Sequence, residues 1–218
     1  MVGRSVGRQA AEGAVLGTLS AKYETGGRGP GTVSGGRGDP GGVSYGSYQL
    51  ASSLRRPEEF LAHEGARWAP EFGRAVSGAP AFGRIWKAIA RREPASFQAA
   101  QHDFIRRTHY DVQVAHVLAQ TGDDIDRRSD AVRDAVWSTA VQHGPQNDLV
   151  VQAMKGGHPG DRALLVAIYA ERARRGRDGR MVHFSRCSAA VQAGVAQRLR
   201  SELQDALAML GVADTWTR

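Results

Sequence analysis

Apolar residues recur at helical spacing along most of the chain. Between Arg8 and Tyr23 they follow one another at steps of three and four, which predicts an amphipathic helix. The same spacing predicts further helices, at Glu58–His63, Ala81–Arg92, Pro94–Gln120, Ser129–Val141, Gly160–Arg175 and Ser188–Leu210. No apolar run approaches the ~18 residues that a membrane-spanning helix needs. The pattern therefore indicates a mainly helical protein.

One segment near the start departs from this pattern. In the range 26–46, ten of the 21 positions are glycine, and Asp39-Pro40-Gly41 is a turn signal. Such a composition is also typical of a flexible linker. Interspersed valines and tyrosines, at Val33, Val43 and Tyr45, favour short strands instead. We therefore expect a single domain, residues 1–218, that is mainly α with a small glycine-rich β-hairpin lobe near its N-terminus.

The candidate chemistry lies in and around this segment. Three motifs follow one another: Tyr23-Glu24-Thr25-Gly26, Gly38-Asp39-Pro40-Gly41 and Gly46-Ser47-Tyr48-Gln49-Leu50. In this order they resemble the catalytic core of goose-type lysozymes and soluble lytic transglycosylases. In that family a helix ends at a glutamate followed by a small hydroxyl residue, and a Gly-x-x-Gln-hydrophobic motif opens the next helix. The strong resemblance covers residues 15–50, and the family's usual methionine is replaced by Tyr48.

A weaker match lies further along the chain, at Ala135–Pro145. It is similar to the helix that closes the cleft of lytic transglycosylases, although the family's Tyr-Asn pair is missing. The resemblance implies an α+β lysozyme-like fold, in which the helices of residues 160–210 complete or extend the core. It also implies cleavage of the β-1,4 bond between N-acetylmuramic acid and N-acetylglucosamine in peptidoglycan.

Glu24 is the candidate general acid. Splitting a glycosidic bond near neutral pH needs a carboxyl group that is still protonated, whereas a free glutamate, with a pKa of ~4.3, is mostly ionised there. The expected position of Glu24 at a helix C-terminus disfavours the carboxylate, and apolar packing from Tyr23 or Tyr48 would raise its pKa further. A solvated glutamate at a helix end is the alternative interpretation.

Asp39 is the candidate base. An inverting hydrolase needs a second carboxylate, roughly 6.5–9.5 Å from the acid, to activate water. The resemblance places a water-positioning carboxylate at Gly38-Asp39-Pro40-Gly41. The alternative is an ordinary turn in which the carboxylate bonds its own backbone. A lytic transglycosylase would need Glu24 alone, because the substrate's own hydroxyl closes a 1,6-anhydro ring.

The candidate substrate contacts come from the motifs around these two carboxylates and from later helices. Ser47 and Gln49 are expected at the start of a helix lining the cleft, where Ser47 would otherwise serve as a helix cap. The complete set of proposed substrate-binding residues is Thr25, Tyr45, Ser47, Tyr48, Gln49, Tyr110, Gln142 and His143. The histidines do not follow a metal-binding pattern, so we expect no metal and no other cofactor.

The excess of basic residues bears on which partners the protein can bind. Twenty-nine Lys+Arg against 22 Asp+Glu give a formal charge of +7, which favours a polyanionic partner such as nucleic acid or a bacterial wall. The arginine-rich segment Arg172–Arg180 supports nucleic acid, but no helix-turn-helix, finger motif or aromatic platform accompanies it. A chitosanase-like hydrolase and an inactive wall-binding module remain further alternatives. The bacterial cell-wall glycan is the expected partner.

The N-terminus lacks the apolar core of a signal peptide, and the single Cys187, expected to be a small buried hydrophobe, can form no internal disulfide. We therefore expect synthesis in the cytoplasm and action on the cell wall in the periplasm after release or delivery. A phage endolysin and a toxin domain delivered by a contractile injection machine both fit. In the second case a delivery protein or an immunity protein is a possible partner.

Overall fold

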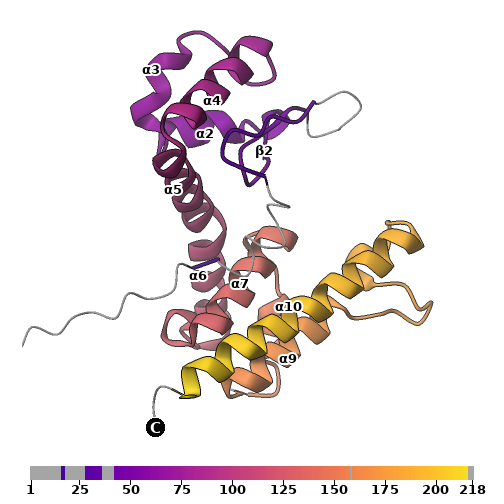
Figure 1. The fold of residues 1–218 in the computed structure, drawn as a ribbon. Coiled ribbons are helices and arrows are strands. Elements are labelled where there is room, and N and C mark those ends of the chain that lie inside the picture. The colour runs from indigo at the N-terminus through magenta and orange to yellow at the C-terminus, as the bar shows by residue number, and fades with distance from the viewer. Residues whose placement is uncertain (1–15, 18–27, 36–41, 158, 216–218) are drawn as a thin grey trace, which may run out of the picture.

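The computed structural model describes residues 16–17, 28–35, 42–157 and 159–215. They form two lobes joined by a long helical rod (Figure 1). The N-terminal lobe contains β1 (Ser44–Tyr45), β2 (Leu50–Ala51), η1 (Ser52–Leu54), α2 (Arg56–Ala62), η2 (Ala66–Trp68), α3 (Ala69–Phe72) and α4 (Pro80–Arg92). The rod contains α5 (Pro94–Ile105), η3 (Arg106–Tyr110) and α6 (Asp111–Thr121). The C-terminal lobe contains η4 (Ile125–Arg127), α7 (Asp130–His143), α8 (Leu149–Ala153), α9 (Asp161–Arg172), η5 (Val182–Phe184) and α10 (Ala189–Thr215). The expectation of a mainly helical chain is confirmed.

Local sequence signals account for several helix ends. Pro80 and Pro94 occupy the first turn of α4 and α5, where the missing amide hydrogen costs no helical bond. The hydroxyl of Ser129 accepts a hydrogen bond from the amide of Val132 at 3.4 Å and caps α7. Gly122 ends α6 with a left-handed φ of 73°. The predicted helices at these places are confirmed.

The predicted helix Pro94–Gln120 differs from the structure in one respect. It follows the rod from α5 to α6, but η3 between them is a π-helix of five residues. Its hydrogen bonds span one residue more than those of an α-helix. The rod is thus two α-helical segments joined in line by a π turn, which Figure 1 shows descending from one lobe to the other.

Two other predictions are wrong. Leu16 and Gly17 form a turn in which Gly17 has a φ of 84°, so these two positions of the predicted helix Arg8–Tyr23 are not helical, and the rest of that range lies outside the described residues. The expected helix start at Ser47 and Gln49 is instead a turn between two strands. The strands pair antiparallel, with Ser44 opposite Ala51 and Tyr45 opposite Leu50. Val33 adds an isolated antiparallel bridge to Tyr45, so the described part of the glycine-rich segment is folded against the hairpin.

Aromatic side chains form the core of the N-terminal lobe. Trp86 lies at its centre, with its ring centroid 4.8 Å from that of Phe97, 5.3 Å from Tyr45 and 5.5 Å from Phe60. The indole also donates a hydrogen bond to the carbonyl of Pro30 at 2.8 Å. Edge-to-face and tilted contacts of this kind add to the stabilisation from buried apolar area. This cluster holds the hairpin against α2, α4 and α5.

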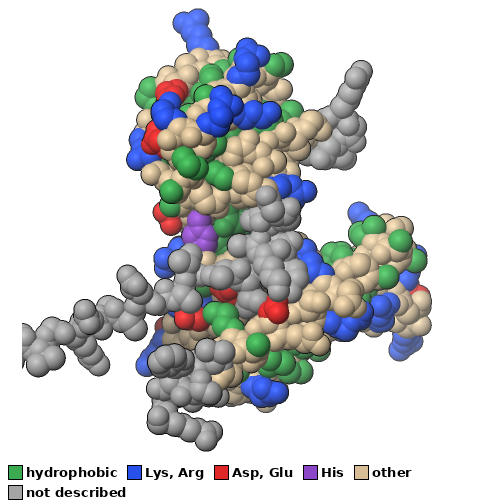
Figure 2. All heavy atoms as spheres, in the orientation of Figure 1, with side chains coloured by type: hydrophobic (Ala, Val, Ile, Leu, Met, Phe, Trp, Pro, Cys, Tyr) green, Lys and Arg blue, Asp and Glu red, His purple; other side chains and the backbone are tan. Residues whose placement is uncertain are grey.

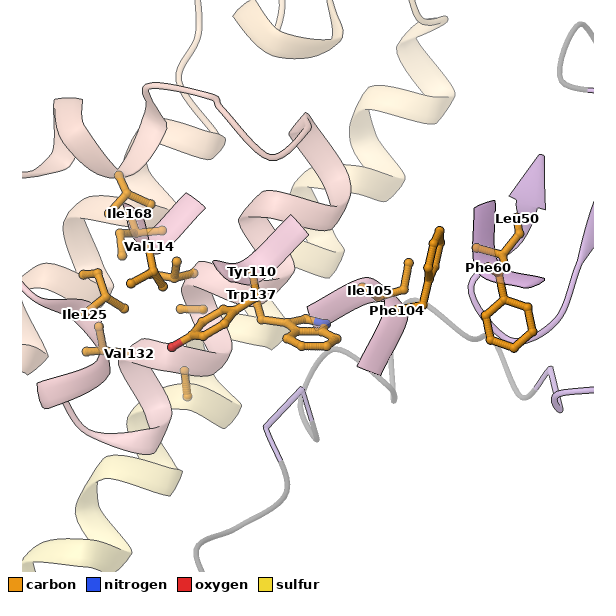
Figure 3. Packing of buried hydrophobic residues seen from close by; sticks show 14 of the residues in the cluster. Leu50, Phe60, Phe104, Ile105, Tyr110, Val114, Ile125, Val132, Trp137 and Ile168 are labelled. Atoms are coloured by element: carbon orange, nitrogen blue, oxygen red, sulfur yellow. The ribbon is translucent and has the colours of Figure 1, made fainter. Parts of the chain in front are cut away.

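The core of the C-terminal lobe is built around α7, which is buried along almost its whole length. Aliphatic residues from α6, η4 and α9 surround it, among them Val114, Ile125 and Ile168. Figure 3 shows buried side chains continuing from Leu50 and Phe60 through Phe104 and Ile105 to Tyr110 and Trp137. The rod therefore carries hydrophobic contacts from one lobe into the other.

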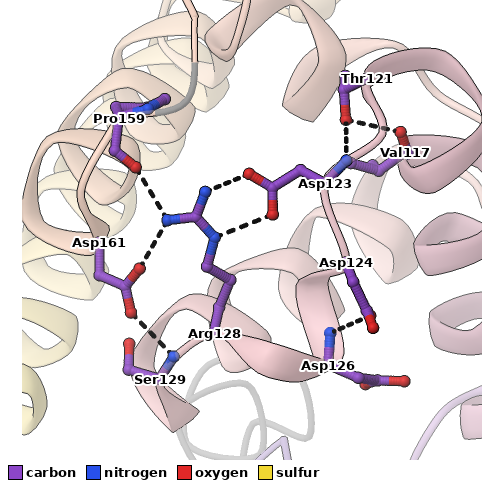
Figure 4. A network of polar contacts seen from close by, with 9 residues as sticks. All are labelled: Val117, Thr121, Asp123, Asp124, Asp126, Arg128, Ser129, Pro159 and Asp161. Atoms are coloured by element: carbon purple, nitrogen blue, oxygen red, sulfur yellow. Dashed lines mark hydrogen bonds and ion pairs between the residues drawn. The ribbon is translucent and has the colours of Figure 1, made fainter.

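A polar network fixes the beginnings of α7 and α9 (Figure 4). The guanidinium of Arg128 pairs with Asp123 and donates to Asp161 at 3.0 Å. Asp161 in turn accepts from the backbone amide of Ser129 at 2.8 Å. Although burial raises the pKa of Asp161, the hydrogen bonds from Ser129 and Arg128 hold it below its usual value. The network joins three loops of the C-terminal lobe through one arginine.

Positive charge is scattered over the face of the molecule drawn in Figure 2. On the face drawn in Figure 2, Lys and Arg side chains are spread over both lobes and do not gather in one patch. Among the described helices, none is long and apolar enough to cross a membrane. Cys187 is partly exposed, so the expectation that it is buried is wrong.

Candidate active site

The turn between β1 and β2 is fastened to α5. Ser47 is 1% exposed, and its amide donates to the side-chain carbonyl of Gln101 at 3.1 Å. Its hydroxyl donates to the side-chain carbonyl of Gln98, one helical turn earlier on the same face. Ser47 therefore positions the turn on the rod, and it does not cap a helix.

Positive φ angles shape this turn at Gly46 and Gln49. Gly46 has a φ of 76°, and a Cβ there would overlap Oε1 of Gln101. Only glycine fits such a contact. Gln49 has a φ of 53°, and its side-chain amide donates to the carbonyl of Gly46 at 3.0 Å. Gln49 thus closes the turn on itself while its side chain stays partly exposed.

Three side chains connect the turn, the rod and the C-terminal lobe. The hydroxyl of Tyr48 lies 2.9 Å from Nδ1 of His102 on α5. The imidazole of His102 stacks on the indole of Trp137 from α7. Burial lowers the pKa of His102, which favours the neutral ring, and the imidazole tautomer decides which partner donates in the bond to the phenol. Residues from both lobes meet at this point.

The chain segment before the Glu24 motif is anchored at the same place. The amide of Gly17 donates to Oδ1 of Asp134 on α7. A Cβ on Gly17 would lie 3.0 Å from Cε2 of Trp137 and 3.3 Å from Cε1 of His102, which shows how closely the backbone approaches the stacked rings. Nε1 of Trp137 is buried and has no hydrogen-bond partner among the described residues. Gly17 precedes Glu24 by seven residues in the sequence.

Two of the predicted substrate contacts are fully buried. The hydroxyl of Tyr45 accepts from the amide of Gly78 at 2.9 Å, and burial raises the pKa of Tyr45. The hydroxyl of Tyr110 donates to Asp126 at 2.7 Å, and its ring lies beside Trp137. Both side chains are 0% exposed. Tyr45 and Tyr110 can therefore act on a substrate only through the residues that they position.

Gln142 and His143 lie at the end of α7, away from the stacked rings. The side-chain carbonyl of Gln142 accepts from Arg172 at 2.7 Å. Arg172 also pairs with Glu202 of α10 at 3.2 Å, and both of these side chains are almost fully buried. His143 is partly exposed and contacts the rings of His183 and Phe184. The structure therefore separates this pair from Tyr48 and Gln49 of the turn.

Glu24, Thr25 and Asp39 lie outside the described residues. Their assigned roles therefore stay predictions.

Sequence reasoning missed several residues that organise this site, namely Gln98, Gln101, His102 and Asp134. A signal was present on the rod: Gln98, Gln101 and His102 are spaced at three and four residues, so they share one helical face. That polar stripe lies in a helix whose core positions, such as Phe97 and Phe104, are aromatic. The sequence offers no comparable signal for Asp134, because its partner is a backbone amide far away in the chain.

Comparison with solved structures assigns the fold. A native chitosanase from Bacillus subtilis MY002 is similar with a TM-score of 0.50 and 15% identity, over 94% of this chain and 91% of that one. A GH46 chitosanase from Gynuella sunshinyii, solved in complex with chitotetraose, is similar with a TM-score of 0.51 and 14% identity, over 88% and 89%. These identities show a shared fold only, and this lysozyme-like fold is the one that the motifs predicted.

Sequence comparison identifies the family. The chain is 40% identical over 141 residues to the type VI secretion system spike protein VgrG3 of Vibrio cholerae serotype O1. The aligned part is 65% of this chain and 14% of that protein, so the chain spans only a small part of its relative's length. Residues 16–203 also match the family described as type VI secretion system spike protein VgrG3-like, C-terminal. The chain therefore belongs to the family of VgrG3-like C-terminal domains.

Proposed function

We propose that this chain is a glycoside hydrolase that cleaves the β-1,4 bond between N-acetylmuramic acid and N-acetylglucosamine in bacterial peptidoglycan. One observation carries the proposal: the motifs containing Glu24 and Asp39 precede, in the sequence, a turn that is fastened to the rod of a chitosanase-like fold. Gly17, anchored on Trp137 and Asp134, begins the segment that leads to the first of these motifs.

In the proposed reaction Glu24 donates its proton to the glycosidic oxygen as the bond to the anomeric carbon breaks. Asp39 accepts a proton from a water molecule, whose oxygen forms the new bond to that carbon from the opposite face of the sugar. The products are an alcohol at the leaving sugar and a reducing end at the other. Asp39 then returns its proton to solvent and Glu24 is reprotonated, which restores both groups.

Among the predicted contacts, Tyr48, Gln49, Gln142 and His143 are partly exposed. Tyr48 and Gln49 lie on the turn next to the proposed catalytic segment and are retained as substrate contacts. Ser47 is retained as a positioning residue, because both its amide and its hydroxyl are already bonded to α5. We treat residues 1–218 as one catalytic unit, since α9 and α10 pack against α7 and complete its core.

The family supports delivery as part of a type VI secretion spike, in preference to release as a phage endolysin. The enzyme would then be made in the cytoplasm of the attacking cell and act on the wall in the periplasm of its target. An enzyme of this kind endangers its producer, so an immunity protein that blocks the site is the expected partner. On the face drawn in Figure 2 the positive charge is scattered, which suits an anionic wall polymer better than a single nucleic-acid groove.

A second candidate function is hydrolysis of chitosan or chitin. The observation that favours it is the fold shared with the two chitosanases. A third outcome, transglycosylation of peptidoglycan, follows if Glu24 acts without Asp39. All three reactions use the same acid and differ in polymer or in product.

Parallel digestion of purified peptidoglycan, chitosan and chitin, followed by mass spectrometry, tests the proposal. We expect muropeptides with reducing N-acetylmuramic acid ends from peptidoglycan, and no soluble oligomers from the other two polymers. Products lighter by one water would instead assign a transglycosylase. Oligomers from chitosan or chitin alone would establish the second candidate, and no product from any polymer would overturn both.

A further inference from the structure

The C-terminal lobe contains a polar pocket that the proposed reaction does not use. Its volume is about 480 Å³, and it lies between the ends of α7 and α9, the beginning of α8, and η5. The lining residues that matter here carry hydrogen-bonding or charged side chains: His143, Asp148, Gln152, Glu171, Arg174 and His183. No group of three or more His, Cys, Asp or Glu among the described residues is arranged to hold a metal ion. The lining side chains can form hydrogen bonds and ion pairs with an organic ligand.

The imidazole of His143 lies in this pocket. Nε2 of His143 is buried and has no hydrogen-bond partner among the described residues. Burial lowers the pKa of His143 to about 3, and the nearby cations Arg172 and Arg198 lower it in the same direction. The ring is therefore neutral at physiological pH. A buried polar atom without a partner costs free energy, which a ligand that supplies one recovers.

Charge is distributed unevenly around the pocket. Behind His143, Arg172 and Arg198 both pair with the single carboxylate of Glu202, at 3.2 and 3.0 Å. Two guanidinium groups therefore lie behind His143, with the carboxylate of Glu202 shared between them. On the other side Asp148 contributes a carboxylate that lies 2.8 Å from Nε2 of His116 and whose side chain is 64% exposed. The pocket thus has cationic side chains behind His143 and a carboxylate at Asp148.

Glu171 and Arg174 complete the lining. Nε of Arg174 lies 2.9 Å from Oε1 of Glu171, and the same oxygen lies 3.3 Å from Nε2 of His183. The Arg174 side chain is 53% exposed, so part of its guanidinium fork remains open to a ligand. An anionic group can therefore bind between His143 and Arg174, while a cationic group is favoured near Asp148.

We propose that this pocket binds the zwitterionic end of a peptide, with its carboxylate toward His143 and Arg174 and its ammonium group toward Asp148. On the substrate proposed above, that group is the stem peptide carried by N-acetylmuramic acid, so the inference rests on the proposed function. The pocket is then a specificity site that favours peptide-bearing glycan over bare glycan. Gln152 supplies an amide to the peptide backbone.

The dimensions agree with this assignment. His143 follows Trp137 by six residues on α7, which corresponds to about 9 Å along the helix axis at 1.5 Å per residue. A stem of three to five residues, extended at about 3.3–3.6 Å per residue, spans roughly 10–18 Å. A glycan strand held at the turn, which meets the buried Trp137 through His102, can therefore place the end of its peptide in the pocket.

The test compares two forms of one polymer: intact peptidoglycan, and the same glycan strands after an amidase has removed their peptides. We expect wild type to show a kcat/KM at least about tenfold higher on the peptide-bearing form. Arg174→Gln and Asp148→Asn should lose most of this preference through a higher KM, while kcat/KM on the stripped strands stays unchanged. Arg162→Gln, an exposed arginine at the other end of α9, is the matched control and should keep the preference.

Calorimetric titration of the full chain with the free tripeptide L-alanyl-γ-D-glutamyl-meso-diaminopimelate separates the two proposals. Equal cleavage of both polymers together with no peptide binding would overturn the pocket assignment and leave the proposed function standing. Peptide binding that Arg174→Gln abolishes, with neither polymer cleaved, would support the pocket and overturn the function. A loss of activity on both polymers in the pocket variants would show a merely structural role and also overturn the assignment.

Discussion

The imidazole of His102 lies flat against the indole of Trp137, with ring centroids 4.5 Å apart and an interplanar angle of 14°. His102 belongs to the rod and Trp137 to the central helix of the C-terminal lobe. Tyr48 extends the pair into the N-terminal lobe through its hydrogen bond to His102. Three parts of the chain thus meet at His102, which makes this contact a place to test the architecture.

Tyr48→Phe should destabilise the protein. The variant keeps the ring but leaves Nδ1 of His102 without its phenol partner, and a typical net contribution of such a bond is about 0.5–1.5 kcal/mol. Urea unfolding monitored by tryptophan fluorescence measures the change. A double-mutant cycle with His102→Leu is the control, and strictly additive effects of the two substitutions would show that the pair is not coupled.

Gly46→Ala should destabilise far more than an ordinary glycine substitution. The left-handed backbone alone costs a side chain about 1–2 kcal/mol, and the new Cβ would overlap Gln101. Gly194→Ala in α10 is the matched control, because a Cβ added there would meet nothing within 4 Å and alanine favours a helix by about 1 kcal/mol. The midpoint temperature of thermal unfolding should fall for Gly46→Ala and rise slightly for Gly194→Ala.

Asp161→Asn should reduce the free energy of unfolding at pH 7 and make that free energy depend less on pH in the acidic range. Because the folded pKa of Asp161 lies below its unfolded value of ~3.9, its carboxylate stabilises the protein above that pH and ceases to do so as the pH falls through the folded pKa. Charge-assisted bonds of this kind contribute about 1.5–3 kcal/mol. Urea midpoints between pH 2 and pH 7 measure the effect, with the exposed Asp103→Asn as control.

Glu24→Gln should abolish wall lysis while leaving thermal unfolding unchanged. The amide preserves the shape of the side chain but has no acidic proton to donate to the leaving oxygen. The decrease in turbidity of a peptidoglycan suspension measures the rate. A variant within tenfold of wild type would remove Glu24 from the proposed mechanism.

Asp39→Asn distinguishes hydrolysis from transglycosylation. If Asp39 activates water, the variant should lose roughly 10²–10⁴-fold in rate, which is the usual contribution of a positioned general base. Product ends identified by mass spectrometry complete the measurement. A folded variant with a near-normal rate and anhydro products would show that the substrate's own hydroxyl does this work.

The sequence predicted the parts of the fold that depend on neighbouring residues. Pro94 in a first turn and Ser129 before an apolar run are local signals, and the helices they begin lie where expected. The turn at Gly17 was missed because the apolar spacing around it remains helical whether or not one glycine breaks the backbone. Gln49 is the clearer case, since a left-handed conformation is uncommon for a residue with a side chain.

The site depends more on contacts between distant segments. Tyr45 and Tyr110 looked like substrate contacts because they are aromatic and near polar motifs, yet tertiary packing buries both. His102 belongs to no motif in the sequence, and its partners come from the hairpin turn and from α7. No local pattern identifies such partners, because they are brought together only when the rod places both lobes around it.

The π turn in the middle of the rod has a geometric consequence for the whole molecule. Each residue advances an α-helix by about 100°, so the extra residue of the π turn rotates α6 about the rod axis relative to α5 by about that angle. It sets the angle at which the face of α5 that holds the hairpin turn is followed by the face of α6 that packs in the C-terminal lobe. Removing one residue from Arg106–Tyr110 would turn the two lobes relative to each other about the rod by roughly a quarter of a revolution.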